Sequence, residues 1–192
     1  PASYLRTGVA WLPWELARGA RSWVLPGYYA ALLETFSRLG IEGLSAQRAV
    51  TLHNALLSLV MIPAGYRIGV ALWPSESRDS EWAGIAVAVL TALLPTLVYY
   101  TPHTLNGTPS MILLSWGYAY WLEARRSNPT NTDALLRCGL MFGAACALRI
   151  TTGVYILVPL LDLFWQHRQR ALKPLLVGAA APLLFVGMVD WL

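Results

Sequence analysis

Long apolar runs are the feature that most limits what this chain can fold into. Charged residues make up only 12% of its 192 residues, against about 25% in an average soluble domain. A helix needs about 20 mostly apolar residues to cross a bilayer. Six runs reach or approach that length: 49–72, 82–100, 107–122, 134–149, 151–166 and 174–191. The sequence therefore predicts an all-α, polytopic transmembrane helical bundle with about six membrane-spanning helices.

A weaker apolar run, residues 23–39, precedes these six. Glu34 and Arg38 interrupt its far end. Such a segment forms either a short crossing or an amphipathic helix lying in the membrane interface. We favour the interfacial helix, and the choice decides on which side of the membrane the N-terminal segment lies.

The whole chain, 1–192, is expected to form a single transmembrane domain. Residues 1–22 are then an external loop, and 49–191 carry the membrane helices. The sequence opens on Pro1 and stops directly after an apolar run. We therefore expect it to be a fragment of a longer polypeptide.

The connections between the runs carry unequal positive charge. Those at 123–133 and 167–173 are rich in arginine and lysine, which is typical of cytoplasmic loops. Residues 101–106 and 149–153 then face the opposite side, as do residues 1–22 if the interfacial helix lies flat. The sequence thus predicts a multi-pass protein of a bacterial inner membrane or an endoplasmic-reticulum-like membrane.

The net charge of +4 is explained by these connections, so no nucleic-acid partner is expected. Cys138 and Cys146 are eight residues apart on one predicted helix, a separation of roughly 12 Å. That is too far for a disulfide. Because the sequence has no His, Cys or carboxylate cluster at ligand spacing, we expect no metal and no cofactor.

The candidate functional residues are polar side chains on the three segments predicted to be external: Glu15, Arg21, Ser22, His103, Thr104 and Arg149. Arg149 is the most informative of them, because an arginine at the edge of the hydrocarbon is costly without a partner or a wet cavity. It either extends to lipid head groups or binds phosphate, whose oxygens match the forked guanidinium.

Other polar residues have simpler interpretations. His53 and Asn54 lie within an apolar run, where such residues more often join helices than bind substrate; they are second-rank candidates. Asp162 and Asp190 are interpreted as interfacial. Most tryptophans fall near predicted helix ends, as in an interfacial aromatic belt: Trp11, Trp14, Trp23, Trp73, Trp82, Trp121, Trp165 and Trp191.

Three segments together resemble the family 22 glycosyltransferases, which are GT-C mannosyltransferase relatives. They are "WELARGARSWVLPG" (14–27), "YYTPHTLNGTPSMILLSWGYAYW" (99–121) and "ACALRITTGVYILVPLL" (145–161). The closing "VGMVDWL" is similar to the start of a fourth element. The resemblance runs from about residue 11 to residue 192, and the order and spacing of the elements fit.

The resemblance implies a GT-C-like membrane fold. It also implies inverting transfer of a mannose-like sugar from a polyprenyl-phosphate donor to a glycan or glycolipid acceptor on the extracytoplasmic face. By position, the donor phosphate or lipid would be bound by Arg21, Ser22, His103, Thr104 and Arg149. Glu15 is the candidate general base, although a salt bridge to Arg18 or Arg21 is the simpler interpretation.

The chain departs from the family pattern in one serious way. The family's catalytic aspartate lies upstream of the tryptophan–glutamate element, and residues 1–13 contain no acid. His103 also stands where many members have arginine. The alternative is therefore a non-catalytic membrane subunit that packs against membrane lipids and other membrane subunits, through small-residue faces such as "GLMFGAACA" and "VGAAAP".

Overall fold

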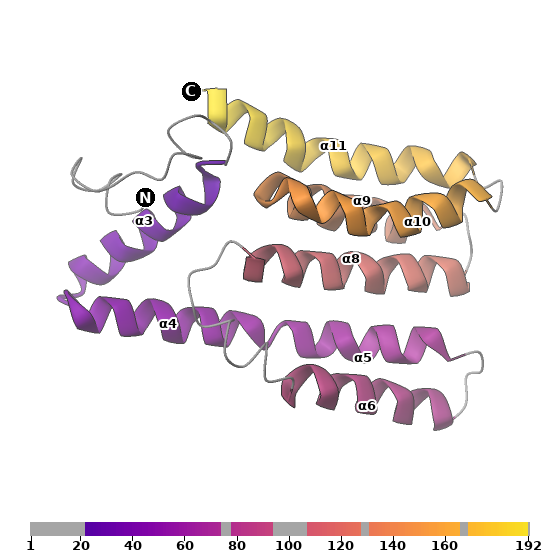
Figure 1. Ribbon diagram of the computed structural model, residues 1–192, viewed down its shortest axis with the longest axis horizontal. Coiled ribbons are helices and arrows are strands. Elements are labelled where there is room, and N and C mark those ends of the chain that lie inside the picture. The colour runs from indigo at the N-terminus through magenta and orange to yellow at the C-terminus, as the bar shows by residue number, and fades with distance from the viewer. Residues whose placement is uncertain (1–21, 74–77, 94–106, 128–130, 166–168, 192) are drawn as a thin grey trace.

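The computed structural model describes residues 22–73, 78–93, 107–127, 131–165 and 169–191. All regular structure in these segments is helical (Figure 1), as the sequence predicts. The helices are α3 (Val24–Arg38), α4 (Leu44–Ser58), α5 (Met61–Leu72), α6 (Arg78–Leu93), α8 (Gly107–Ser127), α9 (Thr132–Leu148), the 3-10 turn η1 (Ile150–Thr152), α10 (Gly153–Trp165) and α11 (Gln169–Trp191).

Two helical stretches of the described residues are long and apolar enough to cross a membrane. They are Leu44–Leu72, which spans α4 and α5 over 29 residues, and Leu172–Trp191 in α11. A third apolar helix, Ile150–Trp165, is shorter. The predicted runs correspond to helices, but six crossings and an interfacial α3 remain predictions.

The first long run bends at a different place from the one the sequence indicates. Pro63 and Gly65 predict a kink at their own positions, whereas the structure has a turn at Leu59 and Val60. Pro63 is the third residue of α5. It is tolerated there because the first backbone N–H groups of a helix have no intrahelical partner to lose.

The helices pack in the order α6, α5, α8, α9 and α11, with α10 beside α9 and α11 (Figure 1). Helix α9 supplies the centre of the core, where Leu135, Cys138 and Phe142 are fully buried. Trp121 of α8 belongs to the same core. This corrects its placement in the aromatic belt, since its ring packs edge-to-face against Tyr118 at 5.9 Å.

The small-residue segments of α9 and α11 pack against each other. A Cβ added to Gly139 would lie 2.0 Å from the carbonyl oxygen of Leu175, and one added to Gly143 would lie 2.4 Å from that of Ala179. Gly178 makes the reciprocal approach to α9. These faces are thus used within the chain itself, where glycine lets two helices approach closely.

The bundle has two distinct ends. What we call the basic end carries Arg78, Arg125, Arg126, Arg137 and Lys173. The last turns of α5 and α8 meet there, because Nη1 of Arg126 donates to the carbonyl oxygen of Val70 (2.9 Å). The opposite end holds the end of α9 and the end of α11 (Figure 1). Arg149 directly follows α9, so we call this the Arg149 end. The described residues of the segments predicted to be cytoplasmic thus share one end, and their side of the membrane remains a prediction.

Candidate functional site

At the Arg149 end, Asp190 joins the last turn of α11 to the first turn of α3. Its Oδ1 accepts hydrogen bonds from the Ser22 hydroxyl (3.1 Å) and the Trp23 backbone N–H (2.9 Å). The Val24 N–H donates in turn to Ser22 Oγ (3.1 Å). A carboxylate at a helix N-terminus satisfies otherwise unpaired N–H groups and complements the helix dipole. Ser22 thus helps cap α3, and its role as a donor ligand remains a prediction.

Arg149 lies at the junction of α9 and η1, where the chain reverses direction. Its backbone is fixed, because its carbonyl oxygen accepts from the Thr152 N–H (2.9 Å) and hydroxyl (2.7 Å). Its Nε donates to Thr151 Oγ1 (2.9 Å), and the residue is exposed. Among the described residues no carboxylate lies within ion-pair distance of it. The terminal guanidinium N–H groups therefore suit an oxyanion from outside the described part of the chain.

Two tyrosines tie α3 to α4 beside Arg149. Tyr29 donates to Asn54 Oδ1 (3.0 Å), and Tyr28 contacts His53 Nε2 through its hydroxyl. Leu148, the residue before Arg149, packs against the cluster that includes Tyr29. His53 and Asn54 thus join helices. Burial raises the pKa of Tyr29 above its ordinary value.

We expect Tyr29→Phe to lower the stability of the full-length protein by about 0.5–1.5 kcal/mol, the usual net worth of one hydrogen bond. Asn54 is only 2% exposed, so the lost bond is a buried one. Thermal unfolding in detergent measures the change. Tyr28→Phe is the control, because Tyr28 is 42% exposed and water can replace its contact. An equal loss of stability in both variants would mean that the buried Tyr29–Asn54 bond contributes no more than the exposed Tyr28 contact.

Four of the predicted site residues, Glu15, Arg21, His103 and Thr104, lie outside the described residues, so only Ser22 and Arg149 can be placed. Both are at the Arg149 end. Within the described segments no group of three or more His, Cys, Asp or Glu side chains is arranged to hold a metal ion. The cysteines at 138 and 146 are both free thiols.

Sequence reasoning missed two features. Asp190, interpreted as merely interfacial, is the residue that joins α3 to α11. A charged cavity at the basic end was not anticipated at all, although Arg67 in the apolar "MIPAGYRIGVAL" was a usable signal. An ionisable residue inside an apolar helix usually has a partner or a function. Arg67 in fact pairs with Glu123 of α8, with Nη2 and Oε2 3.5 Å apart.

A family model described as the Alg9-like mannosyltransferase family covers residues 1–190. No curated protein and no solved structure matches the chain.

Proposed function

Because the chain belongs to the Alg9-like mannosyltransferase family, we propose that it transfers a mannose-like sugar from a polyprenyl-phosphate donor to a glycan or glycolipid acceptor. The reaction takes place at the Arg149 end, on the extracytoplasmic face of a membrane, and inverts the anomeric carbon. The family match supports a glycosyltransferase in general. The lipid-phosphate donor is supported by one observation. Arg149 is exposed, and its guanidinium forms no ion pair with a carboxylate of the described residues.

The proposed chemistry follows from how charge develops during transfer. As the sugar–oxygen bond breaks, the departing lipid phosphate gains negative charge, and fixed cations in a site with little water stabilise it. Arg149 supplies one such cation from a constrained backbone. Arg21 and His103 supply further positive or hydrogen-bonding groups in this proposal, and Thr104 and Ser22 supply hydroxyls.

The acceptor hydroxyl must lose a proton as it attacks, so the reaction needs a base within hydrogen-bond reach. Glu15 is the one acidic residue in 1–22, and we assign it this role within the present chain. An acid contributed from upstream of Pro1, as in the family pattern, would replace it. The two versions differ in whether Glu15→Gln abolishes transfer.

The test is donor selectivity of the purified full-length protein. Radiolabelled mannose is offered either as polyprenyl-phosphate mannose or as GDP-mannose, with a glycolipid extract of the source membrane as acceptor. We expect label to enter glycolipid only from the lipid-linked donor, with the anomeric configuration opposite to that of the donor. Transfer from GDP-mannose alone would overturn the proposal, as would retention of configuration.

A further inference from the structure

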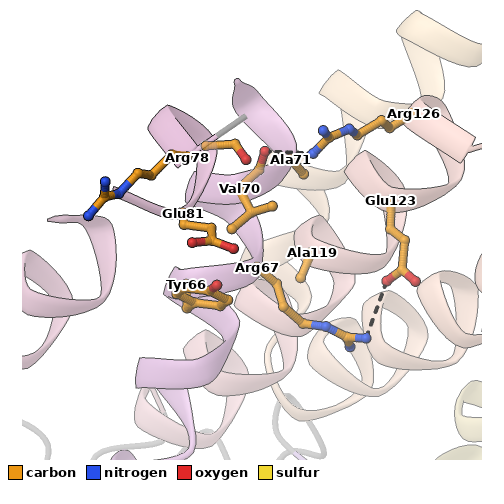
Figure 2. Close-up of a pocket in the computed structure, with 10 residues that line it drawn as sticks. Tyr66, Arg67, Val70, Ala71, Arg78, Glu81, Ala119, Glu123 and Arg126 are labelled. Carbon is orange, nitrogen blue, oxygen red and sulfur yellow. Dashed lines mark hydrogen bonds and ion pairs between the residues drawn. The ribbon is translucent and has the colours of Figure 1, made fainter. Parts of the chain in front are cut away.

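A second polar site lies at the basic end, away from Arg149. A cavity of about 630 Å³ opens between α5, α6 and α8, within the size range of ligand pockets. Figure 2 shows its charged lining, which consists of Arg67, Arg78, Glu81, Glu123 and Arg126, together with the ring of Tyr66. The function proposed above uses none of these residues.

One wall of this cavity is cationic and held in place. The Arg67 guanidinium lies over the rings of Trp116 and Tyr120, 5.4 Å from each centroid, and pairs with Glu123. Arg126 is anchored by its bond to the Val70 carbonyl. A guanidinium has five N–H donors, so each anchored arginine keeps donors for a ligand. Such a wall suits phosphate, which arginine binds through paired hydrogen bonds.

The facing wall, on α6, carries one carboxylate and one guanidinium, those of Glu81 and Arg78. Glu81 is in the first turn of α6, and Figure 2 shows it above the Tyr66 ring. Gly84, one turn further along the same face of α6, packs against that ring. Among the described residues no ion pair is formed by Glu81 or by Arg78. A carboxylate beside an aromatic ring is a favourable environment for an ammonium group.

Two exposed tryptophans lie close in sequence to residues that line the cavity. Trp73 ends α5 and Trp82 follows Glu81 in α6, and both are exposed. Exposed tryptophans at helix ends lie at the level of lipid head groups, and α5 belongs to a stretch long enough to span a membrane. Pockets with basic side chains between membrane helices are typical sites for phospholipid head groups.

We propose that this cavity binds the head group of an aminophospholipid. Arg126 holds the phosphate from the α8 side, and Glu81 with the Tyr66 ring holds the ammonium group. A head group with phosphate alone would bring its negative charge close to Glu81, whereas a head group with both charges places its phosphate by Arg126 and its ammonium group by Glu81. The lipid thus holds α6 against α5 and α8 at the end opposite the proposed transfer site.

The experiment is native mass spectrometry of the full-length protein. The protein is mixed in detergent with dioleoyl phosphatidylethanolamine or with dioleoyl phosphatidylglycerol, and the fraction with bound lipid is measured. We expect phosphatidylethanolamine to bind more tightly. Glu81→Gln should weaken its binding about fivefold, the effect of one partly exposed charge contact, without weakening phosphatidylglycerol. Arg126→Gln should weaken both lipids, because both carry a phosphate.

Two control variants carry the same charge changes at the same end. Asp133→Asn and Arg137→Gln alter exposed residues of α9 that do not line the cavity, and neither should change the binding of either lipid. The proposal is overturned if Glu81→Gln leaves phosphatidylethanolamine binding unchanged, or if the controls weaken it equally. Saturation by water-soluble phosphoethanolamine at the same concentration would likewise overturn a lipid as the occupant.

Discussion

Arg149→Ala is expected to lower sugar transfer by the full-length protein about 10²–10³-fold, the usual effect of removing one preorganised group that stabilises developing negative charge. The loss should appear in kcat rather than only in KM, because the phosphate gains charge as the bond to the sugar breaks. Arg149 is exposed, so its removal leaves the core intact and membrane insertion should be unchanged. Arg21→Ala should lower transfer in the same way.

Two further variants test whether the charge of Arg149, the forked shape of its guanidinium or its position in the fold matters for transfer. Arg149→Lys keeps the charge but loses the forked geometry, so it should retain part of the activity. Arg137→Ala removes an exposed arginine at the basic end and should transfer sugar normally. Full activity of both Arg149→Ala and Arg21→Ala would remove the assignment of these arginines to the donor phosphate.

The second large effect is expected at the contact between α9 and α11. Gly139→Ala places a methyl group 2.0 Å from the Leu175 carbonyl oxygen. That oxygen belongs to backbone and cannot move aside like a flexible side chain, so the two helices must separate. We expect a loss of about 2–4 kcal/mol, measured by thermal unfolding of the full-length protein in detergent.

Gly187→Ala is the control for this prediction, because nothing lies within 4 Å of a Cβ added there. Both glycines are in the interior of a helix, where alanine is favoured by about 1 kcal/mol over glycine. Gly187→Ala should therefore leave stability unchanged or raise it. Equal stability of the two variants would mean that α9 and α11 do not pack as closely as described.

The sequence predicted the helices well where apolar periodicity and breaker residues agree. The run 134–149 corresponds to α9 and the run 174–191 lies within α11. The break between α4 and α5 at Leu59 and Val60 was not foreseen, because neither residue is a helix breaker. Pro63, the apparent breaker, lies where proline costs little.

Contacts between distant segments could not be predicted from the sequence. Ser22 and Asp190 are 168 positions apart, and no local pattern brings α3 against the end of α11. The same holds for Arg67 and Glu123, whose cavity exists only because α5 and α8 lie side by side. Burial of Trp121 was missed for a related reason. Trp121 lies near a helix end in the sequence, as tryptophans at a membrane interface do, but in space it is surrounded by core residues.

We propose that the Arg149 end faces away from the cytoplasm, where a lipid-linked donor meets its acceptor. The most direct test is labelling of single cysteines with a membrane-impermeant maleimide in sealed, right-side-out vesicles. Ile150→Cys and Lys173→Cys are compared in full-length protein with Cys138 and Cys146, and any other native cysteine, changed to alanine. Ile150 is 85% exposed beside Arg149, and Lys173 is exposed at the basic end. We expect residue 150 to be labelled and residue 173 to react only after the membrane is permeabilised. The reverse pattern would place Arg149 in the cytoplasm and would rule out sugar transfer on the extracytoplasmic face at this end.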